Sequence, residues 1–174
     1  CYVDRNGDGA IDDNDRYFYK SIAAPWPGGL NFKIGYKNFD LGTNFRASFG
    51  NYVYNGITEG KVNTEERYNS KGYYENTTID IANLKWTSYN YALSDYFIQN
   101  ASFIKCDNIT LGYSFTGFGK TDRYKGISGR LYASCTNVFT LTDYDGIDPE
   151  QPSGKETSVY PRSRTFLFGV NLNF

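Results

Sequence analysis

The sequence predicts an all-β protein, an antiparallel segment of a transmembrane β-barrel with long extracellular loops. The main evidence is strict alternation between apolar residues and small, polar or charged residues, which gives a strand two unlike faces. Short and long connections alternate between these segments, as in outer-membrane barrels. Aromatic residues, which favour strands, make up 18% of the 174 residues.

Composition excludes several functions. The net charge is −1, so there is no electrostatic case for binding nucleic acid. The chain has no His, the commonest catalytic base and transition-metal ligand, and no residue pattern indicates an enzyme. No run of ~18 apolar residues predicts a transmembrane helix. Cys1, Cys106 and Cys135 match no zinc or disulfide pattern, and we expect the last two to be small buried thiols.

Residues 1–29 are expected to form an extracellular loop that carries a calcium-like sequence. When Asp4 is taken as position 1, oxygen-bearing side chains occupy positions 1, 3, 5, 9 and 12, and position 7 offers its backbone carbonyl. The candidate ligands are Asp4, Asn6, Asp8, Ala10, Asp12 and Asp15. Gly9 occupies position 6, where such a loop turns sharply. Calcium would act as a structural brace, and an acidic surface turn without an ion is the alternative.

Residues 30–49 are predicted to form a hairpin. Two alternating runs are separated by Lys37 and Asn38, a two-residue turn of hairpin type. The face opposite the apolar side chains carries Lys33, Asp40 and Arg46, and a dry sandwich core would not accept such charges. The prolines and glycines of residues 24–29 are expected to interrupt regular structure just before the hairpin.

Residues 50–101 are predicted to be a long extracellular loop, because the alternation is lost there. A connection of ~50 residues is far outside the usual loop lengths and is typically functional or disordered. The aromatic residues singled out in it are Trp86, Tyr89, Tyr91 and Tyr96. They indicate either an ordered loop that faces a ligand or partner, or aromatic side chains that pack on one another within the loop.

Residues 102–141 are predicted to form two further strands, and residues 142–163 a second polar loop. Lys105 and Asp107 interrupt the apolar face near the start of the first of these strands, which is consistent with a strand that emerges from a bilayer. The acidic residues of the second loop are expected to be a solvated turn rather than a cation site.

The final strand, residues 164–174, shows the clearest alternation. Its apolar side chains are Phe166, Phe168, Val170, Leu172 and Phe174. A tilted strand needs ~9–11 residues to cross a membrane, so this one is long enough. Five strands cannot close a barrel, since even the smallest has about eight. The remaining barrel strands are therefore expected to lie outside this sequence.

The order of several short motifs resembles the C-terminal β-barrel portion of the SusC/RagA family, the TonB-linked outer-membrane transporters of Bacteroidetes. The matching segments are Tyr2–Asp12, Tyr36–Leu41, Ala101–Tyr113, Thr136–Thr142 and Tyr160–Phe174. Each motif is weak by itself, but the ordered set covers nearly the whole chain. The resemblance implies the last strands of a 22-stranded barrel, with the plug domain and TonB box outside this sequence. It also implies that Phe174 is an assembly signal for barrel insertion.

The resemblance further implies a function, a location and partners. The chain would be part of a TonB-dependent outer-membrane importer that takes up oligosaccharides or oligopeptides. A SusD-like surface lipoprotein would cap the extracellular loops, and TonB would supply energy through the N-terminal part of the receptor. No residue is expected to do covalent chemistry.

Two other functions fit parts of the pattern. A secreted soluble β-sandwich that binds carbohydrate would show the same alternation with the two sides exchanged, with aromatic residues as sugar platforms and calcium as a brace. Solubility without detergent would favour it over the membrane protein. A β-sandwich glycoside hydrolase fragment would need two facing carboxylates, and the predicted strands offer no such pair.

Overall fold

The computed structural model describes residues 3–60, 94–118, 126–157 and 160–173. The chain divides into two units, each drawn from three stretches of the sequence. The sheet unit comprises Pro25–Phe49, Ser102–Asp143 and Tyr160–Phe174. The loop unit comprises Cys1–Ala24, Gly50–Ala101 and Tyr144–Val159.

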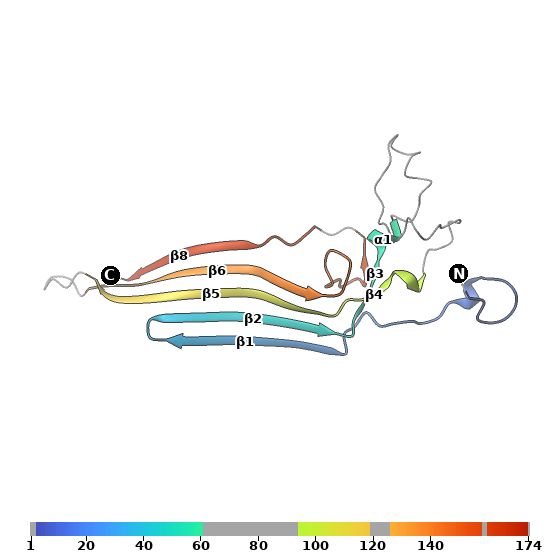
Figure 1. Cartoon of the computed structure of the whole chain (residues 1–174), viewed down its shortest axis with the longest axis horizontal. Helices are drawn as coiled ribbons and strands as arrows, with labels where there is room; N and C mark the ends of the chain where they lie inside the picture. The colour runs from blue at the N-terminus through green and yellow to red at the C-terminus, as the bar shows by residue number, and fades with distance from the viewer. Residues whose placement is uncertain (1–2, 61–93, 119–125, 158–159, 174) are drawn as a thin grey trace, which may run out of the picture. The chain divides into compact units, whose positions relative to one another are not determined.

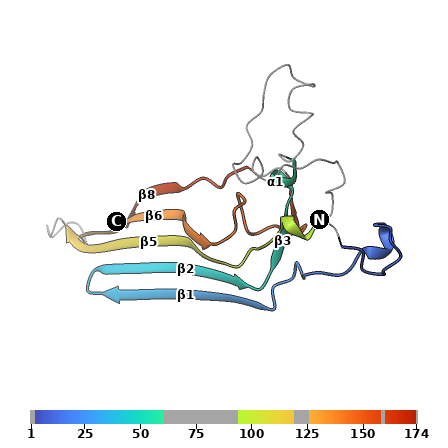
Figure 2. The same ribbon diagram turned by 45° about the vertical axis from the view of Figure 1, so that its right-hand side comes forward.

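The sheet unit is a five-stranded antiparallel sheet in the order β1-β2-β5-β6-β8, as Figure 1 shows. Its strands are β1 (Trp26–Tyr36), β2 (Phe39–Phe49), β5 (Phe103–Phe118), β6 (Ile127–Thr142) and β8 (Thr165–Asn173). The same order is visible from a second direction in Figure 2. The predicted hairpin turn is confirmed, and Lys37 adopts a φ of 53° in it. All five predicted strands are therefore present, and they belong to one sheet.

β1 begins at Trp26, earlier than the predicted hairpin boundary at residue 30. We expected the prolines and glycines before residue 30 to interrupt regular structure, and this expectation was wrong. Residues 27–29 pair with residues 46–48 of β2 in unbroken register. Pro27 is tolerated because β1 is an edge strand of this sheet, where one row of backbone groups needs no partner within the sheet.

The register places most of the apolar side chains of the five strands on one face. Leu30, for example, lies opposite Phe45 of β2, and Leu111 of β5 lies opposite Leu41. These side chains are not covered by the rest of the described chain, since Leu30 is 63% and Phe168 79% exposed. The sheet therefore has two unlike sides, an apolar face that is exposed to its surroundings and a polar face.

Two irregularities keep the faces in phase along the longest strands. The register shifts around Asp107 in β5, and Asn137 of β6, at the same level, has a φ of 52°. A bulge lets one extra residue pass without reversing the faces that follow. Beside this bulge, Cys106 is buried, as expected. Its partners in the neighbouring strands are Phe45 and Phe139, whose ring centroids are 6.3 Å apart. Cys135 is only partly buried.

The loop unit contains regular structure that the sequence did not predict. Its elements are β3 (Tyr52–Asn55), β4 (Ile98–Asn100), β7 (Lys155–Glu156), α1 (Gly56–Gly60) and the short 3-10 helices η1 (Asp13–Asp15) and η2 (Asp95–Phe97). The three strands form a sheet in the order β4-β3-β7. The expectation that residues 50–101 and 142–163 lack strands was therefore wrong, because pairing between segments far apart in the sequence creates them.

A buried carboxylate organises the third segment of the loop unit. Glu156 is 0% exposed, and its side chain accepts hydrogen bonds from the Tyr144 hydroxyl at 2.8 Å and the amides of Ile147 and Asp148 at 3.0 and 2.9 Å. Gly146 makes room for it, since a Cβ there would lie 2.1 Å from Glu156 Oε2. Burial, followed by the bond to Glu156, raises the pKa of the Tyr144 hydroxyl well above its usual value. Several donors thus balance the cost of burying this carboxylate.

In the parts of the chain that the structure describes, no helix has the length and apolar character needed to cross a membrane.

The Glu156 network makes a prediction about the stability of the loop unit. Glu156→Gln replaces an acceptor oxygen with an NH2 group that faces N–H and O–H donors, so one buried donor loses its partner. We expect a loss of about 1–3 kcal/mol in the free energy of unfolding of this unit, measured in the intact protein as faster limited proteolysis between residues 144 and 156. Asp145→Asn, at an exposed neighbouring carboxylate, is the matched control. Equal proteolysis of the two variants would contradict the role of Glu156.

Candidate functional site

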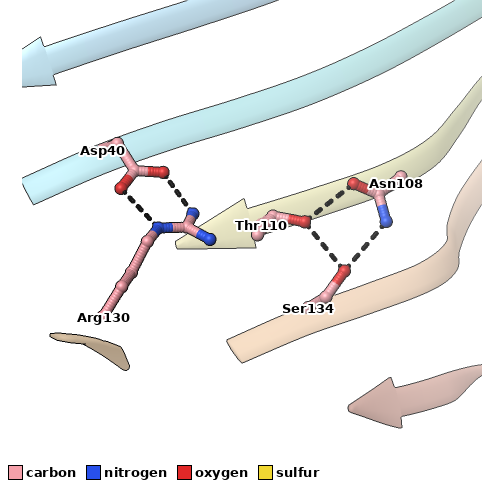
Figure 3. A network of polar contacts seen from close by, with 5 residues as sticks. All are labelled: Asp40, Asn108, Thr110, Arg130 and Ser134. Carbon is pink, nitrogen blue, oxygen red and sulfur yellow. Dashed lines mark hydrogen bonds and ion pairs between the residues drawn. The ribbon is translucent and has the colours of Figure 1, made fainter. Parts of the chain in front are cut away.

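The polar face of the sheet carries an ion pair that spans three strands. The Nε atom of Arg130 on β6 donates to Asp40 Oδ1 on β2 at 3.0 Å, and Nη2 of the same guanidinium contacts Oδ2. β5 lies between these two strands, so the pair passes over it, as Figure 3 shows. A bidentate Arg–carboxylate pair has a defined geometry as well as charge, and it therefore ties the strands to one another.

Gly112 of β5 provides the gap through which this pair passes. A Cβ at Gly112 would lie 2.4 Å from both Arg130 Nη2 and Asp40 Oδ1. Any larger residue would push the guanidinium away from the sheet. The glycine is therefore required by the close approach of two side chains, and this is a reason that the sequence alone does not reveal.

A hydrogen-bonded triangle lies beside the ion pair on the same face (Figure 3). The Nδ2 atom of Asn108 donates to Ser134 Oγ at 2.9 Å, and Thr110 Oγ1 donates to Asn108 Oδ1 at 3.0 Å. The Thr110 and Ser134 hydroxyls are 2.8 Å apart. Polar side chains on this face therefore satisfy one another between strands, and each leaves further donor or acceptor capacity toward the space that the face borders.

Glycines and large side chains alternate across the sheet at the level of the ion pair. The row, read from β1 to β8, is Gly35, Asp40, Gly112, Tyr132 and Gly169. A Cβ at Gly169 would lie 2.2 Å from the Tyr132 ring, so this ring lies flat on β8. The charged and aromatic side chains consequently lie along the sheet instead of projecting from it. Such a face can border a hydrated passage, but it does not assemble a nucleophile with a base.

The calcium-like loop is closed by its own carboxylates. Asp4 accepts hydrogen bonds from the amides of Gly7 and Gly9 at 2.6 and 2.8 Å, and both glycines have positive φ, as expected for Gly9. Asp15 accepts from the amides of Arg5 and Asp12 at 2.7 and 2.9 Å. The first and last candidate ligands thus hold the two ends of the loop together.

The hydrogen bonds of Asp15 affect its titration. The bond from the Asp12 amide, then that from the Arg5 amide, holds the pKa of Asp15 below its ordinary value of 3.8. Because the folded pKa is lowered, the stabilisation is present above the unfolded-state pKa and is lost as the pH falls through the folded value. Loop closure therefore does not depend on pH in the neutral range.

The loop of residues 4–15 has the donor chemistry of a calcium site. Its side chains are hard oxygen donors of the kind that calcium prefers. Among the residues that the structure describes, however, no group of three or more His, Cys, Asp or Glu side chains is placed to hold a metal ion. The carboxylates of Asp4 and Asp15 would have to turn from backbone amides toward an ion, and calcium at this loop stays a prediction.

The predicted aromatic residues are only partly within the described chain. Trp86, Tyr89 and Tyr91, together with the proposed assembly signal Phe174, lie outside the described residues. Tyr96 belongs to η2, is 47% exposed, and contacts the buried Phe97 edge-on with ring centroids 5.2 Å apart. Tyr96 therefore packs on a neighbouring ring while staying exposed, and its contact with a ligand or partner stays a prediction.

Sequence reasoning missed a second aromatic group in the loop unit. The Arg5 guanidinium lies 3.8 Å from the centre of the Tyr17 ring, and the Tyr17 hydroxyl donates to Asp95 at 2.9 Å. This bond to a carboxylate raises the pKa of Tyr17. Lys20 lies over the rings of Tyr19 and Tyr52. The run Tyr17-Phe18-Tyr19 was the available signal, but Asp95, which accepts the Tyr17 hydrogen bond, is 78 positions away.

Charge is unevenly divided between the two units. The loop unit contains 15 of the 19 acidic and 8 of the 18 basic residues, so its net charge is −7. The sheet unit contains the other 4 acidic and 10 basic residues, so its net charge is +6 and the two values sum to −1. The near-neutral total therefore conceals an acidic loop unit and a basic sheet unit.

Comparison with known proteins extends over the whole chain. No family model matches the sequence. The chain is 47% identical over 174 residues to the TonB-dependent receptor SusC of Bacteroides thetaiotaomicron, and 30% identical over 194 residues to the TonB-dependent receptor P3 of Formosa agariphila. Each alignment covers 99% of this chain but only 17% and 19% of the relative. The chain thus spans less than a fifth of the length of these relatives.

Solved structures show the same fold. The structure of the RagAB peptide transporter matches 95% of this chain and 19% of its own, with a TM-score of 0.72 and 22% sequence identity. The RagAB peptide importer in its closed-closed state matches 96% of this chain with a TM-score of 0.68. The predicted fold class, an antiparallel segment of a transporter barrel, is confirmed by this likeness.

The ion pair over Gly112 makes a prediction about the sheet. Gly112→Ala places a Cβ where the guanidinium lies, and Arg130 is expected to swing away from Asp40. The pair is partly exposed, so we expect a loss of about 1 kcal/mol or less in the free energy of unfolding of the intact protein, measured by urea titration. Gly42→Ala, on the same face with no atom within 4 Å of the added Cβ, is the matched control. The explanation fails if Gly112→Ala is as stable as Gly42→Ala in an otherwise unchanged protein.

Proposed function

We propose that this chain, which corresponds to a segment of a SusC/RagA-like TonB-dependent receptor, forms part of the wall of an outer-membrane importer for oligosaccharides or oligopeptides. The observation that carries the proposal is 47% identity to SusC over essentially the whole chain. The relatives are TonB-dependent receptors rather than enzymes. Because the chain covers a small part of each relative, cargo, partners and energy coupling are proposals about the whole receptor.

The geometry of the sheet supports a place in a membrane. Its apolar face is exposed along all five strands, and a face of this kind is stable when lipid covers it. β8 has nine residues, and at a rise of ~3.4 Å and a tilt of ~40° such a strand spans about 23 Å. This length matches the apolar band of outer-membrane barrels, which is about 25 Å tall.

The polar face would border the interior of the receptor. Its ion pairs and hydrogen-bonded side chains are compatible with water and with a hydrophilic cargo, and they fix the wall without blocking the space beside it. The strand ends at the short turns lie together at one end of the sheet, and the ends that continue into the long connections lie at the other. The long connections would then form the extracellular mouth, at which a SusD-like lipoprotein caps the receptor.

Cargo would be captured at this mouth and released to the periplasm when TonB acts on the N-terminal part of the receptor. RagAB is described as a peptide importer, which favours a peptide as the cargo. SusC, however, is more similar to this chain in sequence than RagAB is. The soluble β-sandwich is the weaker alternative, because the sheet resembles a transporter barrel and its apolar face has no second sheet against it within the described sheet unit.

Cell fractionation and uptake test the function. The intact receptor is expected in the outer-membrane fraction, soluble only with detergent. Cells that carry it should take up a fluorescent oligosaccharide or oligopeptide, and a protonophore should abolish this uptake because TonB draws on the inner-membrane proton gradient. Deletion of the receptor gene is the control. Recovery of the receptor as a detergent-free soluble protein, or uptake unchanged by the deletion, would overturn the proposal.

We further propose that the loop of residues 4–15 binds calcium as a structural brace. Isolated extracellular sites of this type have dissociation constants on the order of 10⁻⁴–10⁻³ M, so calorimetric titration of the chelator-treated receptor should detect binding in that range. Asp8→Ala should abolish it. Asp13→Ala is the matched control, because Asp13 is outside the ligand set and pairs with Arg16 at 2.8 Å. The same heat from both variants would show that calcium binds elsewhere or not at all.

A further inference from the structure

We infer that the segment before β8 is a contact site for the phosphate headgroup of an anionic membrane lipid, centred on Arg164. The inference rests on the proposed function, because it requires that the apolar face of the sheet meets lipid. It goes beyond that function by assigning a lipid ligand and the residues that hold it.

Arg164 directly precedes β8. Thr165, the first residue of the strand, pairs with Thr136 on the polar face, and the apolar row of β8 begins at Phe166. Phe166 is 65% exposed and Arg164 is also exposed. A charged residue therefore follows directly at the end of an exposed row of apolar side chains.

The length of β8 places this charge at the edge of the apolar band. The strand from Thr165 to Asn173 is sufficient to cross a band of about 25 Å at the usual tilt. The residue before it is then at the level of the headgroups, where Arg side chains are stable and reach phosphate groups. Tyr160, four residues earlier and 91% exposed, is of the type that is enriched at this level.

Asn137 of β6 fixes the segment that carries Arg164. Its Nδ2 atom donates to the backbone carbonyls of Arg162 and Ser163 at 2.9 and 3.3 Å. In return, Arg164 Nε donates to the Asn137 carbonyl at 3.4 Å. Asn137 can present its groups this way because it adopts the left-handed conformation, which asparagine tolerates better than most residues. The arginine is thus held by its Nε, and the side chain is exposed.

The chemistry of the group defines the ligand. A guanidinium presents parallel N–H donors that match two oxygens of a phosphate, and it is weakly hydrated compared with an ammonium. The adjacent apolar row accommodates acyl chains. A phosphomonoester lipid is therefore preferred over a zwitterionic lipid, whose own cation competes for the phosphate, and over free phosphate, which lacks the chains.

Native mass spectrometry of the intact receptor in mixed micelles tests the site, with phosphatidic acid, phosphatidylcholine and inorganic phosphate as the three probes. We expect retention of phosphatidic acid above the other two. Arg164→Gln should weaken it about fivefold, since one Arg near an anionic surface contributes about 1 kcal/mol. Arg16→Gln, the same change at an exposed arginine of the loop unit, is the control. Asn137→Gly keeps the left-handed conformation but removes the side-chain hydrogen bonds to the carbonyls of Arg162 and Ser163. It should give a loss of phosphatidic acid binding between those of Arg16→Gln and Arg164→Gln.

The results that would reject the lipid site differ from those that would reject the proposed function. Equal retention of phosphatidic acid by Arg164→Gln and Arg16→Gln, or equal retention of the two lipids by the unmodified receptor, would overturn the lipid site. So would displacement of phosphatidic acid by millimolar inorganic phosphate, because the acyl chains would then contribute nothing. In all these cases a receptor found in the outer membrane would leave the proposed function intact. A receptor that is not a membrane protein would remove both.

Discussion

The structure depends on the register of one antiparallel sheet. Cross-strand hydrogen bonds keep residues two apart on the same side, so a shift of a single residue in any strand would move its apolar side chains to the polar face. The unbroken pairing of β1 with β2, and of β6 with β8, maintains this separation across the sheet. One of the register shifts lies at Asp107 and Asn137, and the bulge there restores the phase of the faces.

The polar face shows how such a wall accommodates charge. Arg130 and Asp40 lie on strands that are not neighbours, and they meet only because Gly112 leaves space above β5. The Tyr132 ring uses Gly169 in the same way. In both places glycine is required because a side chain from a neighbouring strand lies directly over it, and its own backbone conformation does not require glycine. Side chains that lie along the sheet leave the space beside it open, which suits the wall of a passage for cargo.

The loop unit has a different physical basis. Its segments are separated in sequence by strands of the sheet unit, yet the second and third of them share a small sheet, and the third contains the buried carboxylate of Glu156. It also contains most of the acidic residues. Long connections that fold together in this way lose less entropy on meeting a partner than flexible loops would. This property suits the proposed mouth of an importer.

The sequence by itself determined the sheet and its two faces, because alternation with period two is a local signal that each strand carries alone. It also indicated the hairpin turn at Lys37 and the closed acidic loop ending at Asp15, whose contacts lie within a dozen residues. The elements β3, β4 and β7 were decided only by tertiary structure, since each is short and forms only when a distant segment supplies its partner. The same holds for the start of β1 at Trp26, where an edge position permits a proline. The roles of Gly112, Glu156 and Asn137 also appeared only in the folded chain, because each depends on a neighbour that sequence distance conceals.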